Sequence, residues 1–222
     1  MHKPSLIPDF AYDPPDVPLD ILHEDAAILV LNKPAGLLTV PGKLENRQDC
    51  LIARLQAKRW DALTVHRLDC DTSGVIIFAR TKQAQGFLGQ EFELRRAQKT
   101  YVARLQGDLA GDSGTVDLPL GSDWDYRPRQ KVDHDHGRPA VTDWQVISRS
   151  PGETRVRLTP HTGRSHQLRV HMLSLGHPIL GDQIYAPETL THHKRLMLHA
   201  ESLSLHHPVT KDRMTFTAPV PF

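Results

Sequence analysis

The pattern of hydrophobic and polar positions changes repeatedly along this chain, and each pattern predicts a different element. Residues 26–32 and 75–79 are almost continuously apolar and rich in β-branched side chains, which predicts buried strands. Residues 36–40 form a shorter apolar run between Pro34 and Pro41, and we expect another strand there.

Other segments alternate between apolar and polar positions, which is typical of strands that bury one face. Residues 101–105, 141–147 and 155–158 show this alternation. Residues 196–205 and 214–216 flank a polar turn, so we expect them to form a closing hairpin.

Apolar residues recur at helical spacing in the remaining segments. Asp49 is placed as the N-cap of a helix that buries apolar residues between 51 and 55. Thr81 is placed as the cap of a second helix. This helix turns one apolar face to the core: Ala84, Phe87, Leu88 and Phe92. Residues 165–175 predict a third helix that ends before Gly176. Helices mixed with hairpin-connected strands predict the α+β class with a largely antiparallel sheet.

Composition limits the class of protein. The 222 residues are 39% hydrophobic and 24% charged, which is typical of one globular domain with a substantial core. The longest apolar run is too short to span a bilayer, and the N-terminus lacks the apolar segment of a secretory signal. Two cysteines, Cys50 and Cys70, form no disulfide framework, so we expect reduced thiols and a cytoplasmic location.

Charge is distributed unevenly. Residues 1–20 form an acidic, proline-rich leader that we expect to wrap over the domain in extended form or to stay mobile. Residues 1–25 hold six acids and one lysine, which leaves 26 Lys/Arg against 20 Asp/Glu in the rest, a net charge of +6. Many of the basic residues form clusters in the sequence that suit contacts with phosphates. The clusters are Arg54, Lys58 and Arg59; Arg95, Arg96, Lys99 and Arg104; Arg127, Arg129 and Lys131; Arg155, Arg157, Arg164 and Arg169.

The strongest candidate for chemistry is the segment His-Arg-Leu-Asp-Cys-Asp-Thr-Ser-Gly at residues 66–74, directly before the apolar run 75–79. It places a carboxylate, Asp69, beside an arginine, Arg67, where a loop meets a buried strand, a common setting for catalytic groups. By itself the segment also fits an Asx turn that only begins the strand.

Other site classes fit this segment less well. A calcium loop beginning at Asp69 needs a glutamate at its twelfth position, which is Arg80. A glycosidase pair is unfavourable because Asp69 and Asp71 lie on one loop and cannot flank a bond from opposite faces. Cys70 is a small buried filler rather than a nucleophile, since no activating partner is identifiable. The histidine pairs lack the spacing of metal ligands: His134 and His136, His166 and His171, and His192 and His193.

Four blocks, in order, resemble the RluA-type pseudouridine synthases, and the resemblance extends from about residue 20 to the C-terminus. They are Asn-Lys-Pro-Ala-Gly-Leu at 32–37, residues 66–74, Lys-Thr-Tyr-Val-Ala at 99–103, and Gly-Arg-Ser-His-Gln-Leu-Arg-Val-His at 163–171 followed by His-Pro-Ile-Leu-Gly-Asp at 177–182. The resemblance implies a single catalytic domain at residues 21–222, with a mixed, mainly antiparallel central sheet flanked by helices and no S4 domain. It also implies an isomerase that converts uridine to pseudouridine in RNA and needs no cofactor or metal.

The resemblance assigns roles to individual residues. Asp69 matches the essential catalytic aspartate, and Arg164 the arginine that pairs with it. Tyr101 matches the tyrosine that stacks on the target uracil and is a candidate to take the C5 proton. Arg67 matches the residue that fills the space of the flipped nucleotide, and Leu168 an apolar residue beside the target base. From the residues alone, Arg67 and Arg164 also fit surface positions, Tyr101 a strand aromatic and Leu168 core packing.

Details favour one branch of the family. His66 stands where RsuA-type members usually have glycine. Residues 36–42 and 123–132 resemble a dual-specificity member that modifies position 746 of 23S rRNA and position 32 of the tRNA anticodon stem-loop. The alternatives are another rRNA or tRNA uridine isomerase without an S4 domain and, more remotely, an inactive RNA-binding module. We expect a monomer that binds RNA but neither DNA nor membranes.

Overall fold

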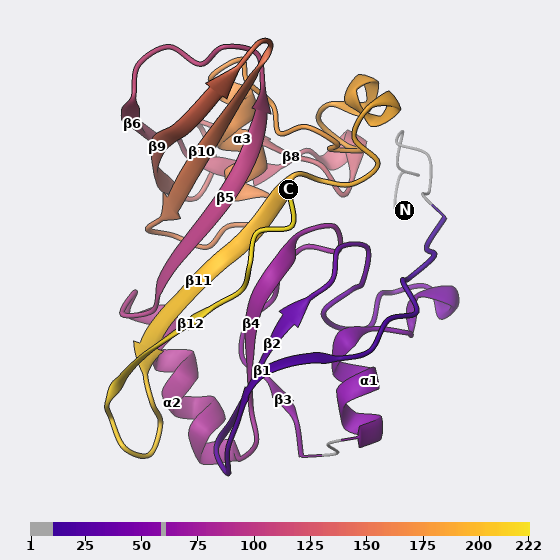
Figure 1. Ribbon diagram of the computed structural model, residues 1–222, viewed down its shortest axis with the longest axis vertical. Coiled ribbons are helices and arrows are strands. Elements are labelled where there is room, and N and C mark those ends of the chain that lie inside the picture. The colour runs from indigo at the N-terminus through magenta and orange to yellow at the C-terminus, as the bar shows by residue number, and fades with distance from the viewer. Residues whose placement is uncertain (1–10, 59–60) are drawn as a thin grey trace. The chain divides into compact units, whose positions relative to one another are not determined.

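A computed structural model describes residues 11–58 and 61–222 (Figure 1). The chain forms two compact units. Tyr12–Tyr101 and Leu198–Phe222 form one, here called the Asp69 unit, and Val102–Met197 forms the core of the other, the Arg164 unit. Residues 1–10 of the predicted leader and Arg59 of a predicted basic cluster lie outside the described residues. No helix in the described ranges is long and apolar enough to cross a membrane.

The sheet of the Asp69 unit has its most buried strand in the middle. Its hydrogen-bonded order is β1-β2-β4-β11, with β12 paired to β11 and β3 to β4. All of these pairs are antiparallel except β4 with β11, which is parallel. The strand bounds are β1 Asp20–Glu24, β2 Ile28–Lys33, β3 Leu63–Thr64, β4 Ser73–Ala79, β11 Leu198–His206 and β12 Arg213–Thr217. Every residue of β4 is buried, as the continuous apolar run predicts.

Helices α1 (Leu51–Lys58) and α2 (Lys82–Glu93) cover opposite faces of this sheet (Figure 1). The core beneath α2 contains Val75 and Ile77 of β4, whereas the core beneath α1 contains Ile76 and Phe78. Successive residues of β4 thus serve two cores, which explains why the strand is apolar at every position. The predicted helix faces are confirmed: Leu51, Ile52 and Leu55 on α1, and Ala84, Phe87, Leu88 and Phe92 on α2. The Thr81 cap is also confirmed, because its hydroxyl accepts from the Ala84 N–H at 3.1 Å.

The strand predicted at residues 36–40 is absent, and the prediction is wrong. Backbone groups of this segment satisfy the start of α1 instead of pairing in a sheet. The N–H groups of Leu51 and Ile52 donate to the carbonyls of Leu38 and Thr39 at 2.8 and 3.1 Å. These N–H groups have no partner within their own helix, so the loop supplies the helix cap.

Asp49, predicted as the cap of α1, has a different role. The helix begins at Leu51, and the Asp49 carboxylate binds the Arg54 guanidinium in a fork with both contacts at 2.7 Å. The end of the leader packs here, as the prediction of an extended wrap implies. Arg54 also donates to the Pro15 carbonyl at 2.8 Å, and the Tyr12 hydroxyl donates to the Asp49 carbonyl at 2.8 Å.

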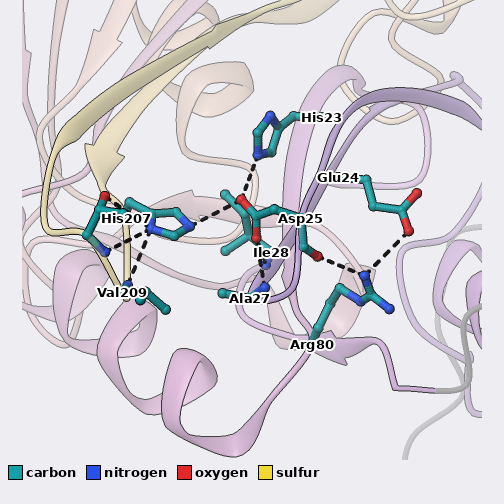
Figure 2. A network of polar contacts seen from close by, with 9 residues as sticks. His23, Glu24, Asp25, Ala27, Ile28, Arg80, His207 and Val209 are labelled. Carbon is teal, nitrogen blue, oxygen red and sulfur yellow. Dashed lines mark hydrogen bonds and ion pairs between the residues drawn. The ribbon is translucent and has the colours of Figure 1, made fainter.

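A network around Asp25 joins the β1–β2 turn to the loop between β11 and β12 (Figure 2). One carboxylate oxygen accepts from the N–H groups of Ala27 and Ile28 at 2.7 and 2.9 Å. The other lies 2.7 Å from Nε2 of His23 and 3.2 Å from Nε2 of His207. Burial disfavours the charged carboxylate, but these hydrogen bonds outweigh it and lower the pKa of Asp25 to about 2.

The Arg164 unit contains an antiparallel sheet and one α-helix. β10 (Glu153–Pro160) pairs with β9 (Val141–Ser150), which pairs with β6 (Ser113–Asp117). β5 (Gln98–Gln106) begins in the Asp69 unit and ends in this one, and β7 (Leu120–Ser122) pairs with β8 (Gln130–Val132). Helix α3 (Gln167–Ser174) ends before Gly176, as predicted. The 3₁₀ turns within residues 11–58 and 61–222 are Glu45–Arg47, Trp124–Tyr126 and Pro187–Thr191.

The observed elements confirm the predicted α+β class with a mixed, mainly antiparallel sheet. The predicted strands at 101–105, 141–147 and 155–158 correspond to β5, β9 and β10, and the closing hairpin corresponds to β11 and β12. The boundaries predicted for the leader (residues 1–20) and for the catalytic domain (residues 21–222) remain predictions.

Gly74 allows β4 and β11 to approach each other at the end of the Asp69 loop. It lies opposite Ala200 in the parallel pair, and its φ of +112° is in the region that side chains disfavour. A Cβ at this position would lie 2.2 Å from the Ala200 carbonyl oxygen. Both the conformation and the space therefore require glycine.

We expect Gly74→Ala to lower the free energy of unfolding by about 3 kcal/mol or more, because backbone must move to relieve the clash. Urea titration followed by circular dichroism measures the change. Gly86→Ala is the matched control, since a Cβ there meets nothing within 4 Å in the interior of α2, and it should stabilise by about 0.5–1 kcal/mol. Equal stability of the two variants would contradict this role of Gly74.

Candidate active site

The candidate catalytic aspartate lies in a tight turn directly before β4. Asp69 is half-buried, and its carbonyl accepts from the Thr72 N–H at 3.2 Å, which closes the turn. Arg67, on the same loop, is exposed. The loop thus presents a carboxylate and a guanidinium from a segment whose far end is fixed in the central strand.

A buried ammonium holds one side of this loop. Lys33, at the end of β2, is 0% exposed, and its Nζ donates to the carbonyls of Pro34, Leu37 and Cys70 at 2.8, 2.6 and 2.8 Å. The Gly36 N–H donates to the same Cys70 carbonyl at 3.0 Å. The block at 32–37 therefore binds the residue that directly follows Asp69. Sequence reasoning missed this role, although a lysine that ends an apolar strand just before Pro and Gly is a usable signal.

A buried hydroxyl holds the other side. Thr39 is buried, and its Oγ1 donates to the Leu68 carbonyl at 2.8 Å and accepts from the Leu68 N–H at 3.2 Å. The residues before and after Asp69, Leu68 and Cys70, are thus each held through a backbone group by residues 33–39. A carboxylate held in this way loses little conformational entropy when it binds its target.

The end of the loop is fixed against β11. The Ser73 hydroxyl lies 2.8 Å from Nδ1 of His199, and Nε2 of His199 lies 3.3 Å from the Ala218 carbonyl oxygen. All three residues are buried. Thr-Ser-Gly at 72–74 therefore serves strand packing, and the candidate functional side chains lie earlier in the loop.

His66 is a neutral packing residue. Its ring stacks on Phe92 with centroids 4.4 Å apart, and its Nε2 accepts from the Ile77 N–H at 3.2 Å. Burial, helped by the nearby charge of Lys99, lowers the pKa of His66 to about 3. An imidazole with this pKa is uncharged at neutral pH.

Tyr101 lies on β5, half-buried against the core beneath α1. Burial of its hydroxyl, reinforced by the negative charge of Asp69, raises the pKa of Tyr101 well above its usual range. The structure thus brings Tyr101 and Asp69 together, with the tyrosine as a neutral phenol. A neutral phenol can relay a proton only if it gives one away at the same time.

Cys70 is unsuited to nucleophilic catalysis. Burial, and then the charge of Asp71, raise the pKa of its thiol to about 12, although Lys33 acts in the opposite direction. The thiolate is therefore negligible at neutral pH, which agrees with the prediction that Cys70 is no nucleophile, although the residue is half-buried rather than buried.

In the Arg164 unit, a buried amide positions the arginine loop. The Gln167 side chain accepts from the Arg164 N–H at 3.0 Å and from the Thr162 hydroxyl at 2.7 Å, and it donates to the Val141 carbonyl at 2.9 Å. Arg164 is half-buried just before α3, and its Nε donates to the Pro139 carbonyl at 3.1 Å. It is therefore neither a freely solvated surface residue nor fully buried.

The other predicted residues of this block differ in their surroundings. Leu168 is buried within α3. Arg169, placed in a surface cluster by the sequence, is only 3% exposed and binds Asp182 in a fork with both contacts at 2.7 Å. It holds the Asp182 turn and is no phosphate contact, so that part of the prediction is wrong. Arg164 and Leu168 belong to one unit and Asp69, Arg67 and Tyr101 to the other, so the Asp69–Arg164 pair stays a prediction.

No group of three or more His, Cys, Asp or Glu residues within 11–58 and 61–222 is arranged to hold a metal ion. Two of the histidines considered as ligands, His166 and His171, have protein partners. His166 lies 2.8 Å from the Tyr185 hydroxyl, and His171 contacts the Thr142 hydroxyl and the Leu118 carbonyl at 2.9 and 3.1 Å.

The family model of RNA pseudouridylate synthases matches residues 27–174, more than half of the chain. The chain therefore belongs to this family, an RluA-type pseudouridine synthase, and is an isomerase that acts on RNA. Similar curated proteins are the dual-specificity RNA pseudouridine synthases RluA of Salmonella typhi (52% identity) and Escherichia coli K12 (51%). Each alignment spans 214 residues, 95% of this chain and 98% of the relative.

Solved structures agree with this assignment. Human RNA Pseudouridylate Synthase Domain Containing 1 matches with a TM-score of 0.78 and 28% identity, over 98% of this chain and 87% of its own. Human RNA Pseudouridylate Synthase Domain Containing 4 matches with a TM-score of 0.74 and 27% identity, over 91% and 88%. The resemblance predicted from four sequence blocks is confirmed.

We expect Lys33→Met to lower the free energy of unfolding by about 3 kcal/mol or more, because the variant leaves buried carbonyls without a donor. Urea titration measures the change. Lys82→Met, at an exposed position of α2, is the control for loss of a lysine and should stay within about 0.5 kcal/mol of the parent. A Lys33→Met protein as stable as the parent would show that the ammonium does not hold the loop.

Proposed function

We propose that this protein isomerises uridine to pseudouridine at position 746 of 23S rRNA and at position 32 of the tRNA anticodon stem-loop. The relatives that are 51–52% identical over 95% of the chain are named as dual-specificity enzymes, which supports this substrate range. The observation that carries the proposal is the loop of Asp69, whose two neighbouring residues, Cys70 and Leu68, are held through their carbonyls by Lys33 and Thr39. The competing substrate assignment is another rRNA or tRNA uridine.

Pseudouridylation breaks the N1–C1′ bond, turns the uracil and rejoins it through C5, with loss of the C5 proton and gain of a proton at N1. The reaction changes no oxidation state and transfers no group to a second substrate, so its atoms balance without a cofactor. Asp69 supplies the carboxylate at the ribose, either as the nucleophile at C1′ or as the base for a ribose proton. Held by its neighbours, it meets the sugar without reorganisation.

Tyr101 stacks on the uracil beside Asp69. Because the raised pKa keeps it neutral, the phenol does not repel the negatively charged detached base as a phenolate would. Its hydroxyl oxygen takes part in C5 deprotonation as a relay, accepting one proton while donating its own.

Arg164 pairs with Asp69 in the assembled site. A guanidinium beside a carboxylate favours the charged form and fixes its orientation. The Gln167 side chain, which binds the Arg164 N–H, sets the position from which this arginine acts. Arg67 occupies the space that the flipped uridine leaves in the RNA, and Leu168 packs beside the target base.

The substrate is RNA rather than DNA, and the enzyme acts as a monomer in the cytoplasm. With the basic charge concentrated in residues 26–222, affinity arises largely from phosphate contacts and depends on salt. Splayed bases around the flipped uridine supply the sequence specificity.

Purified protein should convert both the anticodon stem-loop hairpin and the 23S rRNA hairpin, because short structured RNAs contain the loop bases that such a site recognises. Mass spectrometry of nucleosides after a reagent specific for pseudouridine measures conversion at each position. Conversion of one hairpin alone, or of neither while another uridine reacts, would overturn the dual specificity and leave the enzyme class intact.

Asp69→Asn serves as the chemical control. It should lower turnover by at least about a thousandfold, roughly 4 kcal/mol in the barrier, while RNA affinity stays similar. Asp71→Asn removes the same charge two residues away and should keep turnover within about tenfold of the parent. Comparable losses in both variants would argue against a specific catalytic role for Asp69.

A further inference from the structure

We propose that the segment Trp124–Lys131 of the Arg164 unit is a second RNA contact that stacks a base and binds phosphates beyond the target uridine, an inference that rests on the proposed function. Trp124 is 66% exposed and Tyr126 44% exposed. They are the two aromatic residues among the exposed large hydrophobic side chains of the described ranges. Both lie in the 3₁₀ turn Trp124–Tyr126, between β7 and β8. Aromatic rings this exposed contribute little to a core, so they suit a partner.

The ring of Trp124 is combined with positive charge. The Arg127 guanidinium lies over it, 4.1 Å from the ring centroid. An arginine stacked on an indole offers a flat π surface and a cation together, which matches a nucleobase and its phosphate. This pairing favours nucleic acid over an apolar peptide.

Further basic side chains follow along the same segment. Lys131 is exposed, and Arg129 is half-buried with its guanidinium 5.4 Å from the centroid of the Tyr185 ring. Asp125, exposed within the 3₁₀ turn, disfavours phosphates at that point. We therefore place the stacked base on Trp124 and the phosphates towards Lys131.

The segment is already ordered without RNA. Backbone N–H groups of Tyr126, Arg129 and Asp123 donate to the carbonyls of Asp123, Tyr126 and Arg129 at 3.1, 2.9 and 3.0 Å. The Gln130 N–H donates to the Tyr185 hydroxyl at 2.8 Å. A preformed contact surface loses less entropy on binding, so the stacking energy contributes directly to affinity.

The same tyrosine connects the segment to the arginine block. Nδ1 of His166 lies 2.8 Å from the Tyr185 hydroxyl, and the two rings meet edge to face. His166 is the N-cap residue of α3, two positions after Arg164. The segment that carries Trp124 is thus hydrogen-bonded through Tyr185 to the start of α3, two residues from Arg164.

Equilibrium binding of the anticodon stem-loop hairpin, labelled with a fluorophore and measured by anisotropy, tests this contact. The Asp69→Asn protein is the parent, so that turnover does not interfere. Adding Trp124→Ala should raise Kd roughly five- to hundredfold, the range for loss of one base–aromatic stack. Adding Trp124→Phe, which keeps a ring, should restore Kd to within about threefold of the parent.

Val209→Ala is the matched control, because Val209 is an exposed apolar residue (68%) in the Asp69 unit, and its Kd should not change. Lys131→Ala should reduce the slope of log K against log salt by about 0.7, as expected for one phosphate contact on single-stranded RNA. Trp124→Ala should leave this slope unchanged. In the catalytically intact protein, the weaker RNA binding of Trp124→Ala should raise KM and leave kcat unchanged.

A Kd for Trp124→Ala within twofold of the parent, or an unchanged salt slope for Lys131→Ala, would overturn the inference. Thermal unfolding of each variant separates a lost contact from a lost fold, and Lys131→Ala keeps the test decisive if Trp124→Ala does not fold. If the intact protein converts the hairpins but Trp124→Ala binds RNA normally, the contact at Trp124 is rejected and the proposed function stands. Loss of binding by Trp124→Ala with no conversion by the intact protein would support the contact and reject the proposed function.

Discussion

The ammonium of Lys33, buried at the end of β2, is the interaction on which the site depends. Desolvation of a charge is costly, and three carbonyl oxygens at 2.6–2.8 Å offset that cost. One of these oxygens belongs to Cys70, the residue after Asp69, while Thr39 binds the residue before it. The unit thus fixes the position of the aspartate through its backbone neighbours.

Burial also determines which groups near this loop can react. It lowers the pKa of His66 to about 3, raises the pKa of the Cys70 thiol to about 12, and raises the pKa of Tyr101 above its usual range. All three are therefore neutral at physiological pH. Near neutral pH the imidazole is therefore uncharged and the thiol stays protonated, so neither adds a charge to the surroundings of the Asp69 loop.

Local sequence patterns were sufficient to predict much of the fold. The apolar run of β4, the Thr81 cap and the glycine after α3 each act within a few residues, and each prediction is confirmed. The predictions failed where distant residues compete for the same groups. Residues 36–40 cap α1 instead of pairing as a strand, and Arg169 binds Asp182 instead of facing phosphate. Sequence patterns also indicated Asp69, but the role of Lys33 in holding its loop was not predicted, because that role depends on a contact between residues 37 positions apart.

Hydrogen exchange in the free protein tests most directly whether the Asp69 loop is fixed before RNA binds. The amides of Gly36, Leu68 and Thr72 donate within the loop and its supports. Nuclear magnetic resonance should show them exchanging within about tenfold of the rate of the Ile77 amide in β4, with little change when RNA is added. Exchange of these amides near the rate of an unfolded chain, with protection only after RNA binds, would contradict a preformed site.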